Sequence, residues 1–286
     1  MRALLRSLFF VFLFVFGPLV ALALIVRAGL RQKPAPFPPY PARPAAPPET
    51  IDWPDDLPAP VRHAFETVLG GQPQVITTAV VSGRATLRIA NIPLQARFRF
   101  IHEAGQNYRH LIEVTLFGRP VMHVNESFIN GYARMNLGPM GTFEGTPQLF
   151  QAATLGMWSE AIWFPSLLLT DPRLRWVAVD DRHARLYVPS GEREDCFLIT
   201  FDPITGRIAA FDSLRYRDAD ASAQMLGWHC AIRSYAAFNG VLVPAVSTIQ
   251  WSDMQVPWAE WHVEEVVYNA DVSAYFGDEG ASGAQA

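Results

Sequence analysis

The chain has 286 residues, of which 50% are hydrophobic and 17% charged, and its formal net charge is −4. This composition excludes a globally disordered chain, and the presence of only 2 cysteines excludes a disulfide-dense scaffold. Residues 1–50 carry six basic residues and one acidic residue, so the remainder is acidic. Because nucleic-acid binding needs clustered Lys and Arg, we expect no nucleic-acid partner.

An uninterrupted run of 19 uncharged residues occupies positions 8–26. As a helix with about 1.5 Å per residue, this run is about 30 Å long, which is close to the thickness of the hydrocarbon core of a bilayer. We therefore expect residues 1–33 to form a transmembrane anchor with basic flanks. The alternative is a cleaved signal peptide, because Ala21-Leu22-Ala23 has the small-x-small pattern of a cleavage site, although it lies inside the run.

Basic residues flank the run on both sides, and a strict positive-inside count slightly favours a cytoplasmic globular part. A short basic tail before an apolar run is nevertheless the arrangement of signal anchors, which export the globular part on their carboxyl side. We expect export.

Eight prolines fall between Pro34 and Pro48. Such a segment favours the extended polyproline II conformation, so residues 34–56 are predicted to form a semi-rigid stalk. A ligand for an SH3-like domain is the alternative interpretation.

The globular part is predicted to cover residues 57–272. After a short helix at 58–69, apolar and polar residues alternate with a period of two, and the runs are separated by Gly, Asn and Pro. This pattern predicts antiparallel strands. The expected strands are 75–90, 93–103, 107–117, 120–129, 131–137, 173–180, 183–189, 195–202, 207–217, 228–238, 241–251 and 258–269.

One helix is expected in the middle of these strands, at 146–165, with Thr146 as N-cap and Pro147 in the first turn. The fold class is therefore α+β: a large curved antiparallel β-sheet, or open half-barrel, wrapped around one or two helices and leaving an apolar concavity. A sheet this wide must curl or be covered. From about Gly277 the residues are small and polar, and residues 273–286 are predicted to be a disordered tail.

Glu160 lies beside the apolar stripe of the predicted central helix. A carboxylate there must be paired, or its pKa must rise. It is either a proton-transfer group in a pocket or a structural partner of an inward Arg or of strand amides. We expect an apolar ligand site in the concavity, lined by Met157, Glu160, Trp163, Phe164, Trp176 and Trp251. The alternative for the tryptophans is core packing.

Other titratable residues give weaker signals. Asp180-Asp181 fits a two-residue turn. His183, His229 and His262 lack metal-ligand spacing, so we assign no metal, no cofactor and no catalytic residue. Cys196 and Cys230 lie on separate predicted strands. If the domain is exported, they could form a disulfide; otherwise they are small buried residues.

Several segments together resemble an uncharacterised bacterial family of membrane-anchored proteins, described only as a domain of unknown function. The resemblance covers residues 57–269, and Glu160-x-x-Trp163-Phe164-Pro165 is its most specific element. The family usually has Thr and a basic residue where this chain has Ala245 and Val246. The other matching segments are Leu57-Pro58-x-Pro60-Val61-Arg62, Trp176-(x3)-Asp180-Asp181, Phe201-Asp202-(x3)-Gly206-Arg207-Ile208, Arg215-Tyr216 and Tyr235-(x4)-Gly240-Val241-x-Val243-Pro244-(x6)-Trp251.

The order of elements is also similar to bacterial lipoprotein-carrier folds, in which a half-barrel covers helices and an apolar cavity accepts acyl chains. From the uncharged run, the proline segment, the alternating strands and the central helix, we expect a single-pass protein of the bacterial inner membrane with a periplasmic or other extracytoplasmic domain. We expect it to bind a lipid, an acylated protein or another apolar ligand without catalysis. The alternatives are an envelope hydrolase using Glu160 with Asp180 or a histidine, and a ligand-free interaction scaffold.

Overall fold

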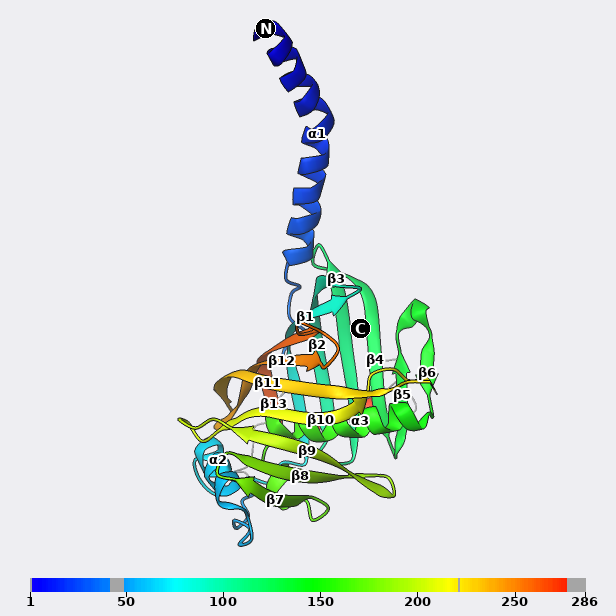
Figure 1. The fold of residues 1–286 in the computed structure, drawn as a ribbon. Coiled ribbons are helices and arrows are strands. Elements are labelled where there is room, and N and C mark those ends of the chain that lie inside the picture. Colours follow the sequence, from blue (N-terminus) through cyan, green and yellow to red (C-terminus); the bar gives the residue numbers. More distant parts are fainter. Residues whose placement is uncertain (1, 42–48, 221, 277–286) are drawn as a thin grey trace.

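The computed structural model describes residues 2–41, 49–220 and 222–276, with residues 2–15 limited to the backbone. Within this part, thirteen strands form one sheet in which every neighbouring pair is antiparallel (Figure 1). The strands are β1 Thr78–Ile89, β2 Ile92–Glu103, β3 Asn107–Leu116, β4 Arg119–Ile129, β5 Tyr132–Asn136, β6 Thr142–Glu144, β7 Arg175–Asp180, β8 His183–Ser190, β9 Arg193–Phe201, β10 Ile208–Tyr216, β11 Met225–Phe238, β12 Val241–Trp251 and β13 Ala259–Tyr268.

The helices are few. They are α1 Arg2–Arg31, α2 Ala59–Leu69, α3 Pro147–Glu160 and α4 Leu167–Thr170, with the short 3-10 helices η1 Gly138–Met140, η2 Ala161–Trp163 and η3 Ser273–Tyr275. The expectation of a large antiparallel sheet with few helices is therefore confirmed.

Two meanders meet in the middle of the sheet. Strands β1 to β6 follow one another outward on one side and β13 back to β7 on the other, and β1 pairs with β13 at the centre. The sheet bends, because α3 contacts β4 and β5 near one edge and also β8 and β10 towards the other edge. The main hydrophobic core lies between this concave face and the helices α2 and α3.

The central helix starts as the sequence predicts. Thr146 is its N-cap, with the side-chain oxygen accepting a hydrogen bond from the backbone N–H of Leu149 at 3.2 Å, and Pro147 occupies the first turn. The α-helix ends at Glu160 and continues as η2, whereas we expected one helix over 146–165. Almost every side chain from Gln151 to Ser159 is buried, because the bent sheet surrounds the helix.

The apolar N-terminal run lies in α1, which is continuous through Pro18 and projects from one end of the sheet (Figure 1). The backbone N–H of Phe117, in the β3–β4 turn, donates to the carbonyl oxygen of Gly29 at 3.2 Å. Among the described residues, none of the helices combines the length and the apolarity that crossing a membrane requires. The side chains of residues 8–15, which belong to the predicted span, lie outside the described ones.

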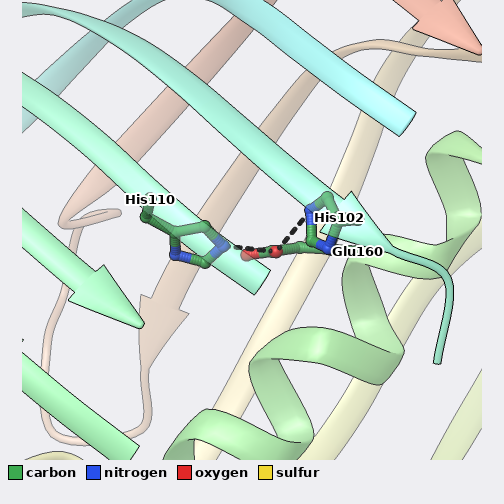
Figure 2. Close-up of side chains that lie close together, drawn as sticks. All are labelled: His102, His110 and Glu160. Atoms are coloured by element: carbon green, nitrogen blue, oxygen red, sulfur yellow. Dashed lines mark hydrogen bonds and ion pairs between the residues drawn. The ribbon is translucent and has the colours of Figure 1, made fainter. Parts of the chain in front are cut away.

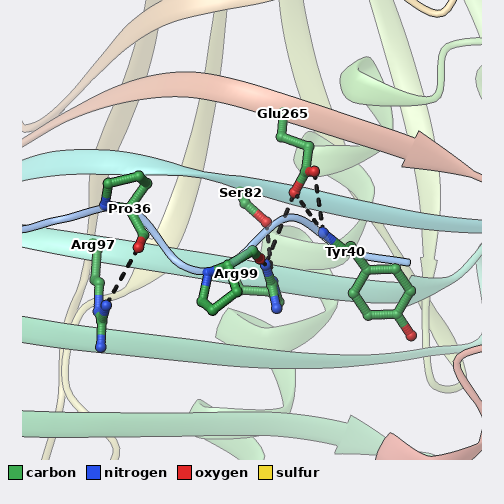
Figure 3. Close-up of polar contacts among 7 residues, drawn as sticks. Pro36, Tyr40, Ser82, Arg97, Arg99 and Glu265 are labelled. Atoms are coloured by element: carbon green, nitrogen blue, oxygen red, sulfur yellow. Dashed lines mark hydrogen bonds and ion pairs between the residues drawn. The ribbon is translucent and has the colours of Figure 1, made fainter. Parts of the chain in front are cut away.

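The first part of the predicted stalk packs against the convex face of the sheet (Figure 3). The guanidinium groups of Arg97 and Arg99 on β2 donate to the carbonyl oxygens of Pro36 and Pro38. The backbone N–H of Tyr40 donates to Glu265 Oε1 on β13 at 3.1 Å. Residues 34–41 are thus a proline strap bound to the domain, and residues 42–48 lie outside the described ones.

A second, smaller core lies under the strap on the convex face. It contains Val80, Ile101 and Val267, with Tyr40 and Tyr275 packed against it. Residues 273–275 of the predicted disordered tail form η3 there. Residues 277–286 lie outside the described part.

Candidate functional site

A cavity of about 110 Å³ lies between α3 and the concave face of the sheet. It is mostly apolar. Some of its lining side chains, such as Ile112, Ile249 and Trp258, are half-buried, so the cavity reaches towards the surface. Its lining is Phe100, His110, Ile112, Glu126, Gly156, Ser159, Glu160, Ile162, Trp163, Phe211, Arg215, Trp228, Cys230, Ile232, Pro244, Ser247, Ile249, Trp258 and Trp261.

Glu160, the last residue of α3, points at two histidines on neighbouring strands (Figure 2). His110 Nε2 on β3 donates to Glu160 Oε2 at 2.8 Å, and His102 Nε2 on β2 lies 3.3 Å from the same oxygen. All three side chains are largely buried, with 15% of the Glu160 side chain exposed and 1% of His102. Their contact joins the central helix to the β2–β3 hairpin.

A second carboxylate lies on the far side of His110. Glu126 Oε2 on β4 is 3.6 Å from His110 Nδ1, and Tyr108 donates its phenol proton to Glu126 Oε1 at 2.6 Å. The polar side chains therefore form one chain across three elements, β3, β4 and α3, from Tyr108 through Glu126 and His110 to Glu160.

The charges in this chain of polar side chains stabilise one another. Burial alone would lower the pKa of His110, but the charge of Glu160 and hydrogen bonds with both carboxylates outweigh it and raise that pKa well above its usual value. Burial alone would raise the pKa of Glu160, and the positive charge of His110 reverses this and lowers it. His110 is thus an imidazolium between two carboxylates. The pKa of His102 is lowered, chiefly by burial, so its imidazole is neutral.

Of the six residues expected to line the concavity, Glu160 and Trp163 line this cavity. Met157 is buried in the main core, and the Phe164 ring lies 5.0 Å from the His102 ring. Trp251 is buried on β12.

Trp176 packs at the other end of the domain. Its indole N–H donates to the carbonyl oxygen of Leu168 at 2.8 Å, and its ring meets the edge of Phe65 on α2. The indole N–H of Trp163, in contrast, donates to the carbonyl oxygen of Pro244 at 3.2 Å and holds η2 against β12.

The other titratable candidates lie elsewhere. Asp180 and His183 pair across the β7–β8 turn at 2.8 Å, away from Glu160 and its two histidines. The two turn residues are Asp181 and Arg182, whereas we expected Asp180-Asp181, because Asp180 still belongs to β7. His229 and His262 each pair with a carboxylate of their own, Asp212 and Glu260.

Both cysteines are free thiols. Cys230 lines the cavity, whereas Cys196 lies on β9 and lines a different hollow. Burial raises the pKa of the Cys230 thiol to about 12, so it stays protonated at neutral pH.

The sequence prediction included Glu160 but missed His102 and His110. The sequence contains a signal that places the two histidines together, namely their spacing around the turn at Gly105. The turn at Gly105 joins β2 to β3 with His102 opposite Tyr108 and Phe100 opposite His110. In such a hairpin both histidines necessarily share one face.

Comparison with solved structures gives distant similarities. A DUF1329 family protein from Desulfovibrio piger is 10% identical, with a TM-score of 0.47 over 78% of this chain and 97% of that one. A LolA superfamily protein from Nitrosomonas europaea is 8% identical, with a TM-score of 0.44 over 78% and 97%. At these values the similarities say nothing about function.

No curated protein matches the chain. One family profile does: that of DUF6544, described as a family of unknown function, which matches residues 49–261. This range extends from before α2 into β13 and so includes α3, both histidines and all four residues of the polar chain. The chain therefore belongs to the DUF6544 family of unknown function.

Proposed function

We propose that this protein is a membrane-anchored protein of the bacterial cell envelope that binds an apolar ligand, such as the acyl chain of a lipid or of an acylated protein, without catalysis. The cavity between α3 and the sheet is the observation that carries the proposal. Apolar pockets with a few convergent polar groups are the usual form of a ligand site.

The size of the cavity limits the ligand. An apolar cavity of about 150 Å³ holds one benzene molecule. A cavity of about 110 Å³ therefore accepts the end of an aliphatic chain, and the rest of a longer ligand would leave past the half-buried side chains of Ile249 and Trp258. The uncharged run at positions 8–26, preceded by a short basic tail as in a signal anchor, supports the location in the envelope.

Gly156 offers a direct test. It lies in α3 and lines the cavity, and an added Cβ would meet only Arg215 Nη2, at 3.7 Å, an ordinary contact. Gly156→Leu should fill the cavity without backbone strain. Gly156→Ala is the matched control, because it brings a similar gain in helix propensity and leaves most of the cavity open.

The measurement is a fluorescence titration of the full-length chain with cis-parinaric acid. We expect saturable binding by the wild type and by Gly156→Ala, and at least about tenfold weaker binding by Gly156→Leu. No saturable binding by the wild type, or equal affinity in all three proteins, would reject the proposal.

An enzyme is the second candidate, because Glu160 hydrogen-bonds His110 at the wall of a cavity and such a pair can move a proton. Hydrolysis of chromogenic acyl esters that is lost in Glu160→Gln would favour it; no turnover above the buffer rate would count against it. An interaction scaffold needs a filled interior, so the cavity favours ligand binding over that function.

A further inference from the structure

His102, His110 and Glu160 form a buried cluster, and the ion pair between His110 and Glu160 does not explain why His102 is buried beside it. The His102 ring is fully buried, with the Phe164 ring 5.0 Å away, yet neither ring nitrogen has a hydrogen-bond partner among the described residues. The 3.3 Å approach of Nε2 to Glu160 lacks hydrogen-bond geometry. A buried polar group without a partner destabilises the fold, so the burial of this imidazole needs an explanation.

The donor atoms suggest that reason. One nitrogen of His102, one nitrogen of His110 and one oxygen of Glu160 all lie within 4.8 Å of one another. Ligands around a first-row ion with bonds near about 2.1 Å are about 3.0–3.4 Å apart. The two nitrogen–oxygen separations, 2.8 Å from His110 and 3.3 Å from His102 to Glu160, are close to this range.

We propose that His102, His110 and Glu160 form a binding site for a divalent transition-metal ion of the zinc type. Two imidazole nitrogens and one carboxylate oxygen are a donor set that zinc takes in sites with three protein ligands. Calcium and magnesium prefer oxygen ligands only, so the two imidazoles disfavour them.

The surroundings of His110 fit this role. A metal-bound histidine commonly donates its other ring N–H to a carboxylate, which fixes its tautomer and orientation. Glu126 stands at Nδ1 of His110, opposite the Nε2 that faces Glu160, and Tyr108 holds Glu126 in place. Binding of the ion would displace the proton from Nε2 of His110 and leave the one on Nδ1.

The position of the cluster leaves room for a further ligand. His110 and Glu160 both line the cavity, so an ion between them would have a coordination position directed into it. That position could take a water molecule or a polar group. The metal site itself requires no apolar ligand, so it stands or falls independently of the proposed function.

The test is calorimetric titration of the full-length, untagged chain with Zn²⁺ after removal of metals by a chelator. We expect one equivalent to bind, and Mg²⁺ to give no signal. Glu160→Gln and His102→Phe should each weaken Zn²⁺ binding at least about 100-fold, and Glu126→Gln about 10–100-fold. His229→Gln is the matched control, because this histidine pairs with Asp212 away from the cluster and its loss should leave the affinity unchanged.

The absorption spectrum of the wild type loaded with Co²⁺ gives a second readout that needs no variant to fold. Intense visible bands of a four- or five-coordinate ion support the site, and a spectrum equal to that of free Co²⁺ in the same buffer overturns it. Failure of the wild type to bind Zn²⁺, or unchanged affinity in folded Glu160→Gln and His102→Phe, would also overturn it.

Discussion

Glu160 ends a helix that is buried on almost every side, and only 15% of its side chain is exposed. Its stability there depends on His110, with which it shares a hydrogen bond of 2.8 Å. Breaking a buried ion pair costs more than the pair itself contributes, because it leaves a charge without its partner.

We therefore expect Glu160→Gln to lower the free energy of unfolding by about 3 kcal/mol. The measurement is urea unfolding of the full-length chain in the presence of a chelator. Glu194→Gln is the control, because Glu194 pairs with Arg175 at 2.8 Å while both side chains are about half exposed, and exposed pairs contribute at most about 1 kcal/mol. Equal losses in the two variants would contradict the assignment of a buried pair.

Asp171 gives a pH-dependent prediction close to the same site. Its carboxylate accepts two hydrogen bonds from the Arg173 guanidinium, which also donates to the carbonyl oxygen of Gly105 in the β2–β3 turn at 2.7 Å. Burial alone would raise the pKa of Asp171, but the hydrogen bonds and charge of Arg173 outweigh it and lower that pKa.

A lowered pKa in the folded state means that Asp171 stabilises the fold above its unfolded pKa and that this contribution is lost as the pH falls through the folded pKa. We expect Asp171→Asn to cost about 1 kcal/mol at pH 7 and progressively less below about pH 4. Urea unfolding of both proteins across this range measures the difference. A gap that widens on acidification would contradict this sign.

Only one residue of the buried His102, His110 and Glu160 group was predictable from the sequence. Glu160 was predictable because a carboxylate beside an apolar helical stripe needs a partner. His102 and His110 were not selected, because a histidine in an alternating strand can face either side until the register of the hairpin is known. The expected partner of Glu160 was therefore an inward Arg or strand amides, or, for the enzyme alternative, Asp180 or a histidine that was not specified.

At the scale of elements, alternation in the sequence located most strands. The burial follows it in β8, where Ala184 and Leu186 are buried and Arg185 between them is exposed. Alternation missed β6, whose three residues are all exposed and carry no such pattern. Residues 161–165 continue the apolar pattern of the helix in the sequence. They nevertheless form η2 and a bend, because Pro165 disfavours helical geometry in the residue before it.

The proline strap was predicted to be extended but not to be bound. Proline content fixes the backbone conformation, whereas the contact depends on outward-facing side chains of β2 far along the chain. Arg99 is the centre of this contact. Its guanidinium bonds Ser82 Oγ at 3.0 Å, meets the carbonyl oxygen of Pro38 and lies over the ring of Phe37.

We expect Arg99→Ala to release the strap, because several charge-assisted bonds are lost together. The Tyr40 amide, which donates to Glu265, should then exchange its hydrogen at least about tenfold faster, as measured by hydrogen-exchange mass spectrometry. Arg84→Ala, which removes an outward Arg paired with Glu264 on β13, is the control. Unchanged exchange at Tyr40 in Arg99→Ala would show that the strap is held by other contacts.

At the scale of the molecule, the central pairing of β1 with β13 closes the fold, and it joins strands from opposite ends of the domain, with Ala79 opposite Tyr268. Alternation cannot reveal this pairing, because it fixes the faces of each strand but not its neighbour. In that order β4 and β5 belong to one meander and β8 and β10 to the other, and the bent sheet brings all four into contact with α3.

Four of the tryptophans, Trp163, Trp228, Trp258 and Trp261, line the cavity and make its occupancy directly measurable. Bromine quenches indole fluorescence on contact, so the decisive measurement is titration of the full-length chain with a fatty acid brominated along its chain, with the unbrominated acid as reference. The account predicts saturable quenching in the wild type and in Gly156→Ala, and little in Gly156→Leu. Quenching that is absent in the wild type, or equal in all three proteins, would contradict it.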